Sequence, residues 1–123
     1  MIGYVTLGVK DMDAAKAFYG DLLADLGAKV LFDMDRIAMI GTSMEEPMVA
    51  VCLPYDGEAA HPGNGNMVAI KAGSKENVDK LYHKALELGA SCDGEPGQRI
   101  PDMFYGAYVR DPDGNKVAFF VFG

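Results

Sequence analysis

The feature that most constrains the fold is an internal repeat. Residues 3–9 (GYVTLGV) and 66–72 (NMVAIKA) share a strand-like pattern, and their apolar rows superpose at a separation of 63 positions. The pairs 18–19 (Phe-Tyr) and 81–82 (Leu-Tyr) superpose at the same separation. The alternative is a chance similarity between two amphipathic strand–helix units, since such patterns recur easily. The repeat predicts two copies of one supersecondary unit.

Each copy is predicted to be a strand–helix–strand–strand–strand unit from its apolar periodicity. In the first copy the predicted elements are a strand at 3–9, a helix over about 13–26, and strands near 28–33, 36–41 and 47–53. In the second copy they are a strand at 66–72, a helix starting after Ser74, and strands near 91–93, 105–110 and 116–122, with a loop at 94–104. The turn-forming segment 54–65 is predicted to link the copies.

Helix ends carry recognisable signals. Asp11 or Asp13 can cap the first helix, and Ser74 can cap the second, because short polar side chains accept hydrogen bonds from the first free backbone N–H groups. Gly27 fits the left-handed position that often follows a helix.

The chain closes with a predicted hairpin at 111–123 (DPDGNKVAFFVFG), in which dense turn chemistry separates two strand-like runs. This stretch resembles the signature of the vicinal oxygen chelate superfamily, the group of glyoxalases, bleomycin-resistance proteins and extradiol dioxygenases. Together with the repeat, the resemblance spans essentially the whole chain. In that family the residue three positions after the turn asparagine is typically a metal-binding glutamate, whereas here it is Ala118.

The resemblance implies an α+β fold and a single glyoxalase/bleomycin-resistance-like domain over 1–123. Two βαβββ modules, one at about 1–55 and the other at about 66–123 after a linker at about 54–65, would form a cupped, mostly antiparallel sheet. The helices would lie on its convex face and the ligand in the cup. Because small members commonly pair, the resemblance also implies a homodimer.

Metal-dependent members place one ligand at each of four positions, and the matching residues here are Tyr4, Ala50, Met67 and Ala118. Zinc, nickel, manganese and iron need nitrogen, carboxylate or thiolate ligands, usually three or more. Two alanines cannot bind a metal, methionine suits soft copper, and a lone tyrosine is a poor substitute. We therefore expect neither a metal site nor a cofactor.

Strand alternation predicts which side chains face the cup, because successive residues of a strand point to opposite faces. Val5, Leu7 and Val9 are expected to pack on the first helix. The predicted ligand-contacting residues are Tyr4, Thr6, Met48, Ala50, Cys52, Met67, Lys71, Tyr108, Ala118 and Phe120. Tyr105 is also placed near the cup. This mainly apolar lining favours a small, partly aromatic or aliphatic ligand.

Other reactive side chains give weaker signals. His83 lies off the apolar face of the second helix and is expected on the surface, whereas His61 lies in the linker and could reach the mouth of the cup. Cys52 could act as a nucleophile only if a neighbour such as Lys71 lowered its pKa, and an inert thiol is the preferred interpretation.

Composition excludes several functions. The formal net charge of −7 argues against nucleic-acid and anionic-membrane partners. No apolar run approaches the ~20 residues of a membrane helix, and no signal peptide is evident. Cys52 and Cys92 are interpreted as reduced, buried thiols of a cytoplasmic protein, with a disulfide as the alternative.

Three functions are compatible with these observations. The first is a metal-free small-molecule binding protein of the bleomycin-resistance type. The second is a metal-dependent glyoxalase- or dioxygenase-like enzyme, which would require the alignment to be wrong in both modules. The third is a metal-free enzyme using Tyr4 or Lys71 as acid or base, for which the sequence offers no partner that would tune the pKa.

Overall fold

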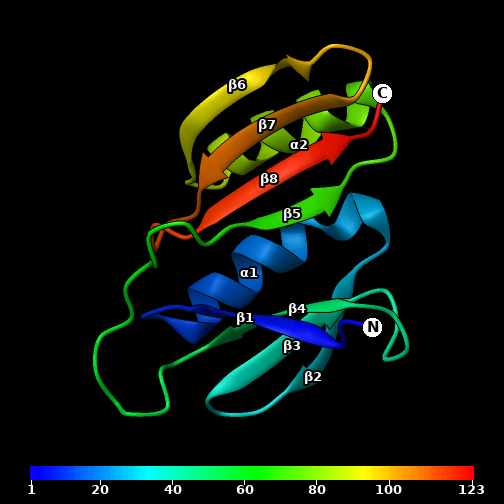
Figure 1. Cartoon of the computed structure of the whole chain (residues 1–123). Helices are drawn as coiled ribbons and strands as arrows, with labels where there is room; N and C mark the ends of the chain where they lie inside the picture. Colours follow the sequence, from blue (N-terminus) through cyan, green and yellow to red (C-terminus); the bar gives the residue numbers. More distant parts are fainter. The chain divides into compact units, whose positions relative to one another are not determined.

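Two units of almost equal length, Met1–His61 and Pro62–Gly123, make up the protein. The computed structural model describes residues 1–123, and Figure 1 shows the elements of both units. Each unit is described by itself below, as unit 1 and unit 2.

Unit 1 has the predicted strand–helix–strand–strand–strand order. Its elements are β1 (Tyr4–Gly8), α1 (Met12–Leu22), a short 3-10 turn (Ala24–Leu26), β2 (Lys29–Asp33), β3 (Ile37–Gly41) and β4 (Met48–Cys52). The strands form one sheet in the order β1-β4-β3-β2. β1 and β4 are parallel, and the other neighbours are antiparallel.

Unit 2 repeats this topology. Its elements are β5 (Val68–Lys71), α2 (Lys75–Glu87), β6 (Ser91–Ile100), β7 (Phe104–Arg110) and β8 (Lys116–Val121). The sheet order is β5-β8-β7-β6, again with one parallel pair, β5 and β8. The chain is therefore an α+β protein of two βαβββ modules, as predicted.

Strand registers confirm the internal repeat residue by residue. Ala50 of β4 pairs with Thr6 of β1, and Ala118 of β8 pairs with Ala69 of β5. Thr6 and Ala69 are separated by the 63 positions found in the sequence. The first strands of the two modules therefore share both their place in the sheet and the separation found in the sequence.

Helix starts follow the predicted caps. The Asp11 carboxylate accepts a hydrogen bond from the Ala14 N–H at 3.0 Å, and the Ser74 hydroxyl accepts one from the Asn77 N–H at 3.1 Å. The first helix is shorter than predicted, because α1 ends at Leu22 and the chain continues as the 3-10 turn. Gly27 ends that turn with φ of 81°, in the left-handed region that glycine adopts without strain.

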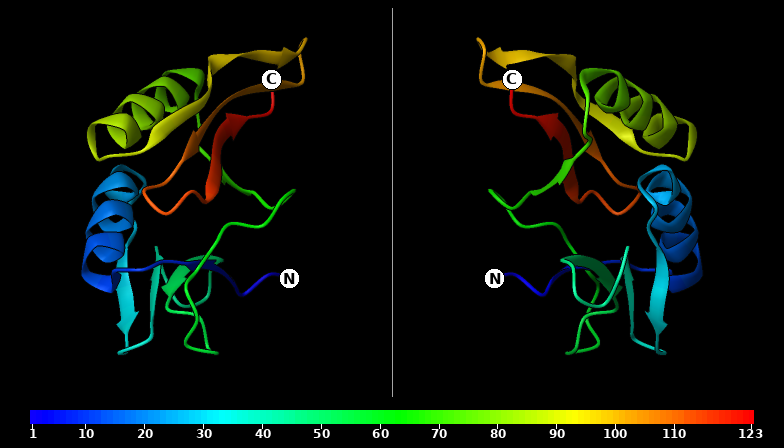
Figure 2. Two further views of the ribbon diagram at one scale, coloured as in Figure 1. Left: turned by 90° about the vertical axis from the view of Figure 1, so that its left-hand side faces the viewer. Right: turned by 90° about the vertical axis from the view of Figure 1, so that its right-hand side faces the viewer.

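Each helix covers one face of its own sheet, as the side views in Figure 2 show. In unit 1 the buried helix residues are Ala15, Phe18, Tyr19 and Leu22, and in unit 2 they are Val78, Leu81, Tyr82 and Ala85. In unit 2 the facing strand residues include Val109, Val117 and Phe119, all fully buried. Burial of such large apolar side chains is the main stabilising contribution in each unit.

The prediction was wrong for 94–104. β6 is a ten-residue strand that continues through Ile100, so the predicted strand at 91–93 is too short and most of the predicted loop is paired with β7. Its register shifts between Cys92 and Gly94, between Gly94 and Gly97, and between Gln98 and Ile100. Bulges of this kind break the two-residue alternation on which the prediction depended. Pro96 is tolerated because β6 is an edge strand.

The two cysteines are free thiols, but neither is buried as expected. Cys52 is partly exposed and Cys92 is exposed. Cys92 lies on the edge strand β6, which has a neighbour on one side only, and this explains its exposure.

Candidate ligand-binding faces of the two sheets

Each sheet has one face that its helix leaves uncovered, here called the open face. Strand pairing determines which residues share it, because residues opposite each other in register point to the same side. The open faces are where the sequence placed its candidate ligand contacts.

The open face of unit 1 carries the predicted residues of β1 and β4. Tyr4 pairs with Met48, and Thr6 pairs with Ala50. Tyr4 keeps 50% of its surface exposed and Thr6 is exposed, whereas Met48 and Ala50 are buried. Tyr4 and Thr6 are therefore the accessible members of these two pairs.

The neighbouring strands extend this face. Cys52 pairs with Gly8, and a side chain at Gly8 would come within 3.0 Å of Ala60 Cβ, so the linker packs on this end of the sheet. Phe32 pairs with Met39, which itself pairs with Ala50, so both lie on the open face. Phe32 is 45% exposed. The sequence did not identify it, because a register shift between Val30 and Phe32 reverses the face expected from simple alternation.

The four residues that the resemblance matches to metal ligands do not fit a divalent metal. Tyr4 offers one phenol oxygen, Met67 offers a thioether, and Ala50 and Ala118 offer no donor and have no exposed surface. In the whole chain no group of three or more His, Cys, Asp or Glu side chains is close enough to hold an ion. This donor chemistry is far from the nitrogen and carboxylate sets that zinc, nickel or iron require.

On the open face of unit 2, very small residues lie beside large aromatic ones. Ala69, Ala118, Tyr108 and Gly94 form one row across the four strands, and Lys71, Phe120, Gly106 and Gly97 form the next. A Cβ at Gly94 would lie 2.7 Å from the Tyr108 ring, and a Cβ at Gly106 would lie 2.7 Å from the Phe104 ring. The glycines therefore allow aromatic rings to lie against the backbone.

Three phenylalanines gather at one end of this face. Phe104 and Phe120 stack with ring centroids 5.3 Å apart and planes 4° apart. Phe122 meets both rings edge-on, at 6.3 Å from Phe104 and 5.0 Å from Phe120. Phe120 is buried, whereas Phe122 is 75% exposed, so the cluster offers apolar surface.

Tyr108 lies between two cations. The Arg99 guanidinium is 5.3 Å and the Lys116 ammonium 5.1 Å from the centroid of the Tyr108 ring, both within the range of a cation–π interaction. Lys116 also pairs with Asp93 at 3.3 Å, and Arg110 pairs with the same oxygen at 3.1 Å. The hydrogen bond from Lys116, together with the Arg110 charge, holds the pKa of Asp93 below its usual value.

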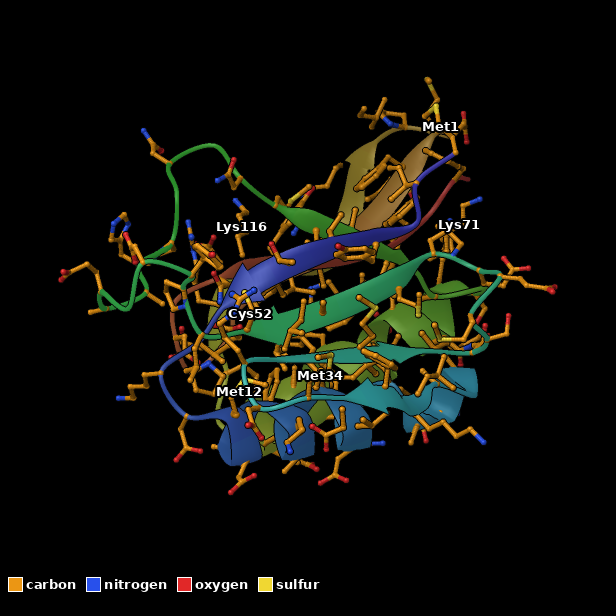
Figure 3. All side chains as sticks on the ribbon, turned by 90° about the horizontal axis from the view of Figure 1, so that it is seen from below. Met1, Met12, Met34, Cys52, Lys71 and Lys116 are labelled. Atoms are coloured by element: carbon orange, nitrogen blue, oxygen red, sulfur yellow. The ribbon has the colours of Figure 1, made fainter.

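Lys71 is the remaining cation of this face. It pairs in register with Phe120 at the end of β5, whereas Lys116 pairs with Arg110 at the start of β8. Figure 3 labels both lysines. The Lys71 side chain is exposed and makes no ion pair, so it is available to a ligand.

Tyr105 was placed on the wrong face. Its hydroxyl donates a 2.7 Å hydrogen bond to Asp79 of α2, so its ring lies on the helix side. Tyr105 and Tyr108 are three residues apart in one regular strand, and such residues point to opposite faces. The Asp79 carboxylate, helped by burial, raises the pKa of the Tyr105 hydroxyl above its ordinary value.

Neither histidine joins an open-face cluster. His83 is exposed on α2, as predicted, and meets the Tyr82 ring edge-on at 5.1 Å. His61 is exposed in the linker.

Sequence reasoning missed Phe104 as a candidate contact, because it was assigned to the loop at 94–104. For Arg99, in the same segment, the sequence favoured a solvated surface charge over a place at the rim of the site. The signal that identifies both is the glycine spacing at 94, 97 and 106, which becomes informative only after the register of β6 and β7 is known.

The fold and the repeat define a two-module βαβββ protein, and the comparisons with known proteins agree. The family model described as Glyoxalase/Bleomycin resistance protein/Dioxygenase superfamily matches residues 1–119, so the chain belongs to this superfamily. No curated protein gave a significant match.

Solved structures support the same assignment. A glyoxalase/bleomycin resistance protein from Albidiferax ferrireducens is 31% identical, with a TM-score of 0.86 over 97% of this chain and 96% of that chain. A glyoxalase-related enzyme from Fulvimarina pelagi is 22% identical, with a TM-score of 0.76 over 98% and 86%. A lactoylglutathione lyase from Agrobacterium tumefaciens is 23% identical, with a TM-score of 0.70 over 98% and 92%. The last two show the shared fold only.

None of the helices has both the length and the apolar character needed to cross a membrane.

Proposed function

We propose that this protein binds a small, partly apolar molecule on the open faces of its sheets without using a metal. The observation that carries the proposal is the identity of the four residues at the family's metal positions, Tyr4, Ala50, Met67 and Ala118. Their side chains supply one phenol and one thioether, so they lack the donors that chelation chemistry needs.

Each open face offers a ligand exposed apolar surface, from Phe32 on unit 1 and from Phe122 on unit 2, together with polar groups. Tyr4, Thr6 and Met67 are exposed, and Tyr108 and Cys52 are partly exposed. Lys71 adds a charge. Predominantly apolar surface with a few convergent polar groups is typical of small-molecule sites.

The test is isothermal titration of chelator-stripped protein with zinc, nickel and manganese, together with elemental analysis of the protein as purified. We expect no stoichiometric uptake. Tight uptake at one ion per chain would overturn the proposal and favour glyoxalase- or dioxygenase-type chemistry. A double variant, His61→Gln with His83→Gln, is the control: uptake that disappears in this variant comes from the surface histidines.

A thermal-shift screen of small organic molecules then tests binding itself. Ligands that bind the native state raise the melting temperature by mass action. We expect hits among aromatic or branched compounds, and their effect should not change when chelator is added. A screen without hits would contradict the proposal.

We further propose that the protein forms homodimers in the cytoplasm. Exposed apolar side chains on unit 1, including Val30, Met34 and Met44, are candidates for burial between subunits. The two free thiols suit a reducing compartment. Light scattering coupled to size exclusion should give about twice the chain mass of 13.2 kDa. A mass of one chain would contradict the dimer.

A further inference from the structure

The open face of unit 2 is cationic although the chain as a whole is acidic. The net charge of the chain is −7. This face nevertheless presents Lys71, Arg99, Arg110 and Lys116, and among the ion pairs there Asp93 is the only carboxylate. Asp93 pairs with Arg110 and Lys116, which leaves Lys71 and Arg99 without a carboxylate partner. The local charge of this face is therefore positive, opposite in sign to the net charge of the chain.

The exposed Arg99 side chain makes two contacts that restrict its position. Its guanidinium lies over the Tyr108 ring and donates one hydrogen bond to the Glu95 carbonyl. A Cβ at Gly97 would come within 2.8 Å of this guanidinium, so a larger residue there would displace the end of the Arg99 side chain. An arginine has five N–H donors in a planar fork that matches a carboxylate. Most of these donors have no protein acceptor.

Apolar surface adjoins this cation. In the row of Tyr108 the next residue, Ala118, is fully buried and Ala69 beyond it is exposed, and the partly exposed Phe104 ring stacks on the buried Phe120 ring. A flat body resting on this face would contact the accessible side chains, which are Tyr108, Ala69 and Phe104, while a charged group at its end would meet Arg99. The Arg99 cation and the adjoining apolar side chains would therefore suit a ligand with one anionic end and one apolar end.

We infer that the ligand of this face is an organic anion, a carboxylate attached to an aromatic or branched apolar body, with Arg99 binding the carboxylate. The inference rests on the proposed binding function and adds the chemical class of the ligand. Lys71 lies on β5 and Arg99 on β6, the two edge strands of the sheet, whose backbones are about 14 Å apart at the usual strand spacing. A small ligand therefore contacts one of the two cations, and Arg99 is the one that is already positioned.

Three matched probes test the chemical class: benzoate, benzamide and benzylamine share one ring and differ in charge. Binding is followed by backbone amide shifts in a nitrogen–proton correlation spectrum at constant ionic strength. We expect benzoate to shift the amides of Gly94, Gly97 and Gly106. Benzamide should bind about tenfold more weakly, because it lacks the charge-assisted hydrogen bonds, and benzylamine should bind more weakly still.

Two charge-neutralising variants and a control assign the cation. Arg99→Gln should weaken benzoate binding about tenfold and leave benzamide binding unchanged. Lys71→Gln should change benzoate binding no more than about twofold, because its charge acts at a distance through solvent. Lys80→Gln removes the same charge from an exposed position on α2 and should have no effect. Melting temperatures of all variants check that each one folds.

Several outcomes would overturn the inference. Equal affinity for benzoate and benzamide, or a preference for benzylamine, would show that the face does not select anions. Loss of benzoate binding in Lys71→Gln but not in Arg99→Gln would remove Arg99 from the site. If benzoate fails but neutral compounds from the screen bind, the ligand class is wrong while the binding function stands. If no compound binds, both the ligand class and the proposed binding function are wrong.

Discussion

Replacing Asp111 by alanine should destabilise unit 2 strongly, because this carboxylate holds the β7–β8 turn together. Its Oδ1 accepts hydrogen bonds from the N–H groups of Asp113 at 2.9 Å and Asn115 at 2.8 Å. Its Oδ2 accepts one from the Asn115 side-chain amide at 3.1 Å. Asp111 and Asn115 are only 4% and 8% exposed, so water cannot replace these bonds freely.

The size of the loss in the free energy of unfolding follows from the hydrogen-bond donors that Asp111→Ala leaves without a partner. Leaving a buried donor unsatisfied costs about 1–3 kcal/mol, and Asp111→Ala affects two donors of Asn115 that are buried. The third donor, on Asp113, is only partly buried and can turn to water. We therefore expect the free energy of unfolding to fall by about 2–6 kcal/mol, a large part of the 5–15 kcal/mol typical of a domain.

Urea unfolding followed by circular dichroism is the assay, with Asp35→Ala as the matched control. Asp35 is an exposed turn residue of unit 1, so its replacement removes the same charge without removing such bonds. The control should stay within about 0.5 kcal/mol of the unmodified protein. A loss below about 1 kcal/mol in Asp111→Ala, or an equal loss in both variants, would refute the reasoning.

Three further predictions concern unit 2. Phe119→Ala should lower the free energy of unfolding by about 3–5 kcal/mol, because the ring is fully buried; urea unfolding measures this, and a loss below 1 kcal/mol would contradict the assigned core. Gly106→Ala should cost about 1–3 kcal/mol and reduce benzoate binding, because the new Cβ displaces the Phe104 ring; unchanged stability and binding would show that the ring need not lie there. The hydrogen bond from Tyr105 to Asp79 stabilises the folded state and raises the pKa of Tyr105. This stabilisation is fully present below pH 10 and is lost as the pH rises through the raised pKa of the folded state. Tyr105→Phe should therefore be less stable than the unmodified protein at pH 8 and closer to it at pH 11, whereas an equal difference at both values would exclude the bond to Asp79.

The repeat and the turns were predictable because they depend on local chemistry. Apolar spacing located both helices, Asp11 and Ser74 capped them, and the pattern of the first strand recurred at the same separation in the second module. These signals act between residues that are near in the chain, so they can be recognised without any knowledge of the tertiary structure. The family assignment followed from them.

The open faces were less predictable, because strand faces depend on register. A bulge in β2 moved Phe32 to the open face of unit 1, and bulges in β6 turned a predicted loop into an edge strand. Tyr105 was misplaced although simple alternation separates it from Tyr108. The errors in β2 and β6 arise because one extra residue in a strand reverses the face of every residue that follows, whereas the error at Tyr105 departed from the alternation of a regular strand.

The sequence by itself therefore determined the two βαβββ modules and the turn at 111–115, since these are matters of composition and local spacing. Only the tertiary structure decided which side chains meet. Arg99, Tyr108 and Lys116 come from three different strands, and the glycines beneath them gain a role only when β6 and β7 are paired. A cation beside an aromatic ring is a property of strand pairing, and no single segment of the chain encodes it.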